Sequence, residues 1–383
     1  MTVTSNIHYN LLAWAASTAY LVGLRVSNGG NAYSCITAGT SAASGGPTGT
    51  GASITDGTVF WKWLSIIDYT TIPLWWTGIP TTLTQPIIGL LWRNGGNIAT
   101  PVNLLTTSIT LTGKTTTAVN NVTLQAAPGE SWVDNIGTNP YYYNPTNGVA
   151  ITSSVSANAT FVVNQQYTVF SGLQIENTSA TGGSIHNTNK FTLDGCILRG
   201  VGNDPGYLAG GAAIRNCLII YDTNTAGPGI RLDSVGVMIN STVVRPSNRT
   251  AGGTSFVAAY GTSIVRNTAI FGFTVAPTGT FNTDGHNASN NAASTPGTTG
   301  NITTVPYNTT TFVQPDTSLA NPDFRLVVGS TLKDAGVTDV VNLPASVDAF
   351  RTSRPQGSAW DIGAFEVLQA GGVSTFSPHP VWA

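Results

Sequence analysis

Five segments in the middle of the chain repeat a strand-like run, one small turn-forming residue and a second strand-like run. The turn-forming residues, which we call pivots, are Gly172, Gly195, Asn216, Asn240 and Asn267, at separations of 21 to 27 residues. A period of this length is typical of solenoids, in which each repeat forms one coil. Gly and Asn suit the left-handed backbone conformation that turns a strand around a corner. The repeat therefore predicts an all-β chain with a right-handed single-stranded parallel β-helix.

Residues at a fixed distance from the pivots share a chemical character. Because side chains alternate along a strand, each set would form one column through the stacked coils. The position one after the pivot includes Cys196 and Cys217, which we expect to be neighbouring, buried and reduced. Two further columns are apolar and expected to point inward: Phe170, Leu193, Ile214, Met238 and Val265 two residues before the pivot, and Ile175, Leu198, Ile219, Val243 and Ile270 three after it.

The outward columns contain both ion-pair candidates and an apolar stripe. Asp194 with Arg215, and Glu176 with Arg199, share columns on adjacent coils and could pair. The apolar stripe, at outward positions, consists of Ile197, Leu218, Ile220, Val244 and Phe271. Monomers rarely expose such a surface, so either a long loop or another subunit should cover it. Only 8% of residues are charged, and this low charge together with the stripe predicts a homotrimer with three helices side by side.

The regions on either side of the repeat have different patterns. Residues 1–65 are rich in aromatic residues and Gly, with short alternating runs that predict a small antiparallel β module. Residues 66–100 contain prolines that permit only short helical turns, and we expect them to cap the open end of the core. The β-helix is predicted at 101–320, a closing segment at 321–370 and a tail at 371–383, whose Phe376 and Trp382 suit a strap on a neighbour.

Composition argues against several functions. A net charge of −2 without a basic run gives no electrostatic attraction to nucleic acid or an anionic membrane. There is no run of 18 apolar residues and no basic stretch at the start, so we expect no membrane insertion and synthesis in the bacterial cytoplasm without a signal peptide. Three cysteines and four scattered histidines lack metal-site spacing, so no metal or other cofactor is expected.

Several motifs resemble known families. The runs NNVTLQAAPGESW (120–132) and TVFSGLQIEN (168–177) resemble the opening coils of bacterial and phage pectate-lyase-like right-handed β-helix proteins, and NPDFRLVVGSTLKDAG (321–336) with VDAFRTSRPQGSAWDIGAFE (347–366) resembles their closing segment. The N-terminal module is similar to small aromatic modules of phage tail proteins and, more loosely, to chitin-binding-type modules. This similarity rests on Trp14, Tyr20, Gly23, Val26, Gly30, Tyr33, the run GTSAASGGPTGTG (39–51) and Asp56-Gly57-Thr58. The resemblance implies a spike or fibre of a phage or phage-like particle, attached through this module.

Two classes of residue are candidates for a site. Hydrolysis of a polysaccharide requires two carboxylates, and Asp204 and Asp222, in loops between strands, could converge; the alternative is that both only shape their turns. Lyase chemistry would need clustered acids, which the helix body lacks. For sugar stacking the aromatic candidates are Tyr33, Trp61 and Trp63, which could instead form the core of the module, and Tyr141, Tyr142 and Tyr143, which we expect to be exposed and to contact sugar or protein.

The sequence thus favours a particle spike or fibre subunit, on the particle surface, that binds a host surface polysaccharide and other particle proteins. The rival function is a polysaccharide depolymerase, either a glycoside hydrolase or a lyase, on the same scaffold. A bacterial surface adhesin is a third reading, which the missing signal peptide disfavours.

Overall fold

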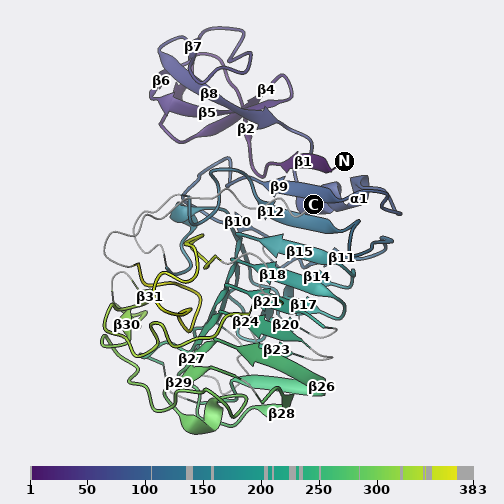
Figure 1. Ribbon diagram of the computed structural model, residues 1–383. Helices are drawn as coiled ribbons and strands as arrows, with labels where there is room; N and C mark the ends of the chain where they lie inside the picture. Colours follow the sequence, from purple (N-terminus) through teal and green to yellow (C-terminus); the bar gives the residue numbers. More distant parts are fainter. Residues whose placement is uncertain are drawn as a thin grey trace.

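The computed structural model describes residues 2–104, 106–134, 141–156, 159–201, 206–208, 211–223, 230–232, 236–249, 252–283, 285–319, 322–339, 341 and 347–368. Its main body is a right-handed parallel β-helix whose coils stack from β9 to β29, with a small β module at the end where the chain begins (Figure 1). The fold class predicted from the repeat is confirmed. In the described part of the chain, no helix is long and apolar enough to cross a membrane.

The coils have three faces, each a parallel sheet. The first contains β1 (Val3–Ile7), β9 (Ile87–Leu91), β12 (Val122–Ala126), β15 (Thr168–Ser171), β18 (Phe191–Asp194), β21 (Ala213–Arg215) and β24 (Val237–Ile239). The second contains β11 (Ile109–Leu111), β14 (Ala159–Val163), β17 (Gly183–Asn187), β20 (Gly206–Leu208), β23 (Ile230–Leu232) and β28 (Thr278–Phe281). The long strand β26 (Phe256–Arg266) pairs with β23 and β24 and so joins these two faces.

The third face lies beneath the segments that close the fold. It contains β10 (Val102–Asn103), β13 (Ala150–Ser153), β16 (Gln174–Asn177), β19 (Ile197–Gly200), β22 (Leu218–Tyr221), β25 (Thr242–Val244), β27 (Ala269–Phe271) and β29 (Ala288–Ser289). Two 3-10 helices, Pro145–Asn147 and Ala292–Ser294, and the hairpin of β30 (Phe312–Gln314) and β31 (Asp323–Leu326) lie outside the three faces.

The predicted register is confirmed. Phe170, Leu193, Ile214, Met238 and Val265 pair successively along the first face, and all are fully buried. Ile175, Leu198, Ile219, Val243 and Ile270 do the same on the third face. Every pivot has a left-handed φ: 65° at Gly172, 58° at Gly195, 52° at Asn216, 48° at Asn240 and 50° at Asn267. Cys196 and Cys217 are free and buried side by side.

The apolar stripe is covered by the chain itself. Ile197, Leu218, Ile220, Val244 and Phe271 are fully buried. They pack in one cluster with Trp132 and with residues of the closing region such as Phe312 and Phe365. Of the two covers predicted for the stripe, the structure has the chain's own loops and hairpin, so this surface is not left for a second subunit to cover. The stripe therefore gives no support to the predicted homotrimer.

A short helix closes the end of the core next to the module. The helix α1 (Ile72–Gly78) begins after Thr71, whose side chain accepts a hydrogen bond from the Leu74 N–H, and Pro73 stands in its first turn, where it leaves no hydrogen bond unmade. Trp75 is fully buried. An added Cβ at Gly89 on β9 would lie 2.7 Å from the Trp75 ring, so only Gly admits this contact. The helix α1 thus packs on the end of the coil core, whereas β9, also within residues 66–100, is a strand of the β-helix.

The N-terminal module is a five-stranded sheet in the order β2 (Leu12–Ala13), β4 (Arg25–Asn28), β5 (Asn31–Thr37), β8 (Val59–Ile66) and β7 (Ile54–Asp56). The last four strands are antiparallel, whereas β2 is parallel to β4. A second pair joins β3 (Ala19–Tyr20) and β6 (Gly39–Thr40). Because β1 pairs with β9 in the β-helix, the module begins after residues 3–7 rather than at residue 1.

Buried charges fix the module to the helix. Arg25 of the module donates two hydrogen bonds to Glu130, at 2.7 and 2.9 Å, and Arg93 contacts the same carboxylate at 3.0 Å. Burial alone would raise the pKa of Glu130, but the two guanidinium groups outweigh it and the pKa lies below its usual value. His8 stacks on Trp92 at 5.0 Å, and burial lowers its pKa to about 3, so it is neutral there. The joint is therefore a packed interface.

Candidate glycan-binding surface

The predicted catalytic candidate Asp222 belongs to an ion-pair chain. Its carboxylate accepts from Arg199 Nη2 at 2.5 Å and from Arg249 Nε at 2.6 Å, and the Tyr142 hydroxyl donates to it at 3.0 Å. Arg199 also pairs with Glu176, as the shared column predicted. Burial raises the pKa of Asp222, but both arginines outweigh this effect and the pKa is lowered. The Asp222 carboxylate is therefore ionised near neutral pH and bonded to three side chains of its own chain. Asp204 lies outside the described residues.

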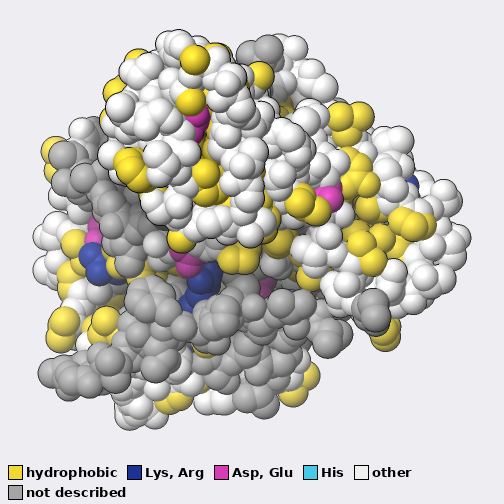
Figure 2. Space-filling view, turned by 90° about the horizontal axis from the view of Figure 1, so that it is seen from above, with side chains coloured by type: hydrophobic (Ala, Val, Ile, Leu, Met, Phe, Trp, Pro, Cys, Tyr) yellow, Lys and Arg dark blue, Asp and Glu magenta, His cyan; other side chains and the backbone are white. Residues whose placement is uncertain are grey.

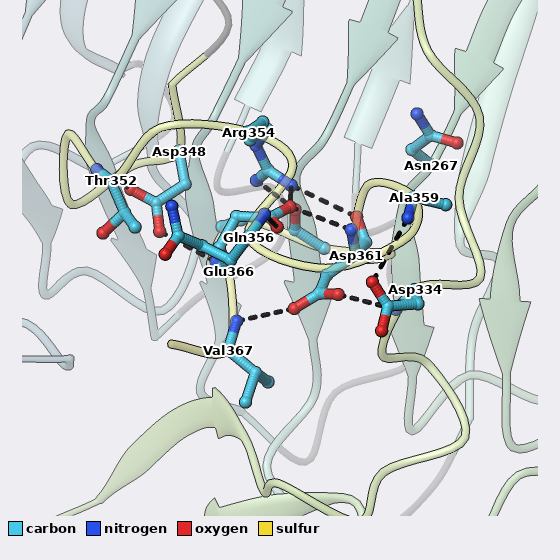
Figure 3. A network of polar contacts seen from close by, with 12 residues as sticks. Asn267, Asp334, Asp348, Thr352, Arg354, Gln356, Ala359, Asp361, Glu366 and Val367 are labelled. Carbon is cyan, nitrogen blue, oxygen red and sulfur yellow. Dashed lines mark hydrogen bonds and ion pairs between the residues drawn. The ribbon is translucent and has the colours of Figure 1, made fainter. Parts of the chain in front are cut away.

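The closing segment holds a second group of carboxylates (Figure 3). Glu366 pairs with Arg354 at 2.5 Å, and both side chains are fully buried. Asp348 accepts from the backbone N–H groups of Thr352 and Glu366 at 2.6 and 2.8 Å. Asp361 accepts from the N–H groups of Asp334 and Val367 at 2.7 and 2.6 Å. A buried segment without regular strands needs other acceptors for its backbone N–H groups, and these carboxylates supply them.

Two of these carboxyl groups have raised pKa values. Burial is the main cause for both Asp348 and Asp361, the charge of Glu366 adds to it, and each pKa rises to about 6. The backbone hydrogen bonds and Arg354 act in the opposite direction. Their hydrogen bonds to backbone N–H groups tie the turns of the closing segment to one another. Among the described residues, no group of three or more metal-ligating side chains is gathered in one place.

The aromatic candidates of the N-terminal module form its core. Tyr33 and Trp61 are 1% and 0% exposed, so a sugar ring cannot stack on them, and the core alternative is confirmed for both. The Trp61 indole donates to Asp56 at 3.0 Å and stacks edge-on against Tyr20. Trp63 packs against the same cluster and is partly buried, with its indole bonded to Asn31. A module with few aliphatic residues uses its aromatic rings as its interior.

The exposure predicted for Tyr141, Tyr142 and Tyr143 is wrong. Tyr141 and Tyr143 are buried and Tyr142 is partly buried. The reason is the apolar stripe, which the tyrosines help to cover. The Arg325 guanidinium lies 3.8 Å above the Tyr141 ring, and that of Arg199 lies 5.4 Å from the Tyr142 ring. Tyr141 lines a pocket, whereas Tyr142 belongs to the Asp222 chain.

A polar groove lies on the side of the β-helix, at the corner between its first two faces. It has a volume of about 350 Å³ and is built from the turns that follow β11, β14 and β17 on successive coils. We call it the side groove. Its walls carry amide and hydroxyl groups and one amino group: Lys114, Thr115, Thr116, Asn164, Gln165, Gln166 and Asn189.

Hydrogen bonds between coils fix the shape of this groove. Gln165 is buried, and its amide bonds both the N–H and the carbonyl of Lys114 at 2.8 Å. Asn189 donates to the Asn164 carbonyl at 2.8 Å. The side chains of Asn164 and Gln166 are exposed. Such amides donate and accept at once, which matches the hydroxyl groups of a sugar. The groove therefore offers hydrogen-bonding groups on a rigid frame.

One aromatic ring, Tyr167, and one further cation, Lys190, are next to groove residues in the sequence. Tyr167 follows Gln166 directly and has a left-handed φ of 50°, and the Lys190 amino group lies 5.3 Å from the centre of its ring. Lys114 donates to the Ile79 carbonyl at 2.7 Å. Sequence reasoning missed this site because it searched for acids and aromatic runs. The usable signal was the polar run just before β15 and β18, at the same corner of adjacent coils.

Comparisons with known proteins add one finding on the fold. No family model and no curated protein matches the sequence. Among solved structures, the chain is similar to pectate lyase Pel9A, with 14% identity, a TM-score of 0.40, and coverage of 78% of this chain and 91% of that one. The strand pairing described above establishes the parallel β-helix independently of this likeness.

Proposed function

We propose that this chain is a spike or fibre subunit of a phage or phage-like particle, which binds a host surface polysaccharide without cleaving it. The observation that carries the proposal is the side groove, whose exposed amides lie on a rigid stack of coils. An extended polysaccharide can follow such a frame from coil to coil. In this arrangement the N-terminal module attaches to the particle, and its charged joint with the helix keeps the two parts in a fixed orientation.

The state of the carboxylates supports binding over cleavage. A hydrolase needs one acid and one base or nucleophile that are free to act on the substrate. Within the described residues, Asp222 and Glu176 are held by arginines, and Asp348, Asp361 and Glu366 are held by backbone N–H groups or Arg354. Low surface charge also suits a role that depends on hydrogen bonds. Figure 2 shows a face on which few charged side chains appear.

The test is binding of purified capsular and O-antigen polysaccharides by the intact chain. For a polysaccharide that binds, we expect Gln166→Ala and Asn164→Ala each to weaken binding roughly threefold to tenfold, the equivalent of one hydrogen bond. The matched control is Gln314→Ala on β30, outside the groove, which should leave binding unchanged. Equal affinities of all four proteins would show that the side groove is not the site.

A further inference from the structure

A second pocket lies on the covered side of the molecule, between the β30–β31 hairpin and the end of the closing segment. Its volume is about 560 Å³, and we call it the closing pocket. Aromatic rings and aliphatic rim residues form its walls: Tyr141, Phe350, Phe365, Val313, Val328 and Leu368. Val313, Val328 and Leu368 are 41%, 74% and 48% exposed. Three large aliphatic side chains around one concavity are an apolar surface that water solvates poorly.

The polar groups in this pocket already have partners. Arg325 bonds Asp323 at 2.6 Å and lies over the Tyr141 ring. The Asp348 carboxylate is held by backbone N–H groups, and Glu366 is held by Arg354. A ligand would therefore find mainly apolar surface, with cations and acids that are already neutralised. This chemistry fits an uncharged peptide with apolar side chains better than it fits a hydroxyl-rich sugar.

The chain itself contains a segment of that kind next to the pocket. Leu368 lines the pocket, and residues 369–383, QAGGVSTFSPHPVWA, follow it and lie outside the described residues. This segment contains no Lys, Arg, Asp or Glu, and it carries Phe376 and Trp382. Because it is covalently attached, its effective concentration at the pocket is roughly millimolar.

We propose that residues 369–383 dock in the closing pocket of their own chain, with Phe376 and Trp382 as the apolar anchors. Docking covers the exposed rim residues Val313 and Val328 with uncharged side chains. Phe376 lies eight positions after Leu368, a reach of up to roughly 28 Å when extended, which is ample for a return to the same pocket. The segment then adds a strap over the region that already covers the third face of the helix.

Thiol reactivity in the intact chain tests this docking. The native cysteines Cys35, Cys196 and Cys217 are all buried, so a thiol introduced on the surface is the reactive one. Val328→Cys places a thiol on the pocket rim, and Val119→Cys is the control, since Val119 is 71% exposed and does not line the pocket. We expect the thiol at position 328 to react at least tenfold more slowly than the thiol at position 119.

Substitution of the anchors should remove this protection. With Phe376→Ser and Trp382→Ser together, the thiol at 328 should react about tenfold faster, while the rate at 119 stays the same. Protection should also be independent of protein concentration. Equal rates at the two positions in the intact chain, or no acceleration by the anchor substitutions, would overturn the proposal. Protection that is lost on dilution would overturn it as well, because a second copy would then supply the segment.

Discussion

Replacement of Asp222 by Asn separates a structural carboxylate from a catalytic one. The Asp222 side chain is 1% exposed and contacts Arg199 and Arg249 at 2.5 and 2.6 Å. The neutral amide of Asn at position 222 would leave Arg249 without this carboxylate and Arg199 with the Glu176 carboxylate alone. Removing one partner of a buried ion pair costs about 3–5 kcal/mol. Because both arginines keep some exposure, we expect the lower end, about 3 kcal/mol, at pH 7.

The pH dependence of this effect has a definite sign. The pKa of Asp222 is lower in the folded chain than in the unfolded chain, so its contribution is present above about pH 4. It is lost as the pH falls through the folded-state pKa. The difference in unfolding free energy between the parent protein and Asp222→Asn should therefore shrink towards pH 3.

Urea unfolding followed by circular dichroism measures this difference. The control is Asp316→Asn. The Asp316 carboxylate accepts hydrogen bonds from the N–H and the hydroxyl of Ser318, and an Asn oxygen can accept the same bonds. We therefore expect the free energy of unfolding to change by at most about 0.5 kcal/mol. A loss below about 1 kcal/mol for Asp222→Asn at pH 7 would refute the structural role. If the variant were fully stable yet lost a polysaccharide-cleaving activity of the parent, Asp222 would be catalytic.

Three further predictions concern the pivots, the closing segment and the stripe. Asn240 has a φ of 48° and a buried side chain for which the described residues show no hydrogen bond. We expect Asn240→Ala to lower the free energy of unfolding by about 1–2 kcal/mol and Asn240→Gly to lower it much less, as read from urea midpoints. Equal losses for the two variants would contradict the left-handed pivot. The pKa values of Asp348 and Asp361 are raised to about 6, so the folded chain binds more protons than the unfolded chain between pH 4 and 6. The free energy of unfolding should therefore rise by about 1 kcal/mol per group from pH 7 to pH 5. A urea midpoint that stays flat or falls over this range would contradict the raised pKa values. Leu218→Asp places a charge in the interior of the chain, so this variant should be unfolded at any protein concentration. A folded monomeric variant would show that the stripe is not an internal core.

The coil register was predictable because its determinants are local. Each pivot and its flanking strands lie within about ten residues, and the alternation that places Phe170 or Ile175 inward depends only on strand geometry. The ion pair of Glu176 and Arg199 followed from the same columns. The β-helix therefore came from one repeated pattern, but its limits did not. Strands β1 and β9 precede the predicted start at residue 101, and the last strand of the third face, β29, ends at Ser289.

The covering of the third face was not predictable in the same way. Trp132, Phe312 and Phe365 lie far from the stripe in sequence and show no period, so nothing marked them as its cover. The same cover buries Tyr141 and Tyr143, which explains why a run of three tyrosines in a polar loop is not exposed. Asp222 likewise gained its role from Arg249, 27 residues away in a different turn.

The central claim, that the chain binds a surface polysaccharide and leaves it intact, is tested most directly by the length of the bound polysaccharide. The intact protein is incubated with a capsular or O-antigen polysaccharide that it binds, and the molar mass of the polysaccharide is followed by size-exclusion chromatography with light scattering. We expect the polysaccharide to co-elute with the protein and, after removal of the protein, to keep its original molar mass. A progressive fall in molar mass with new reducing ends or unsaturated ends would contradict the account and identify a depolymerase.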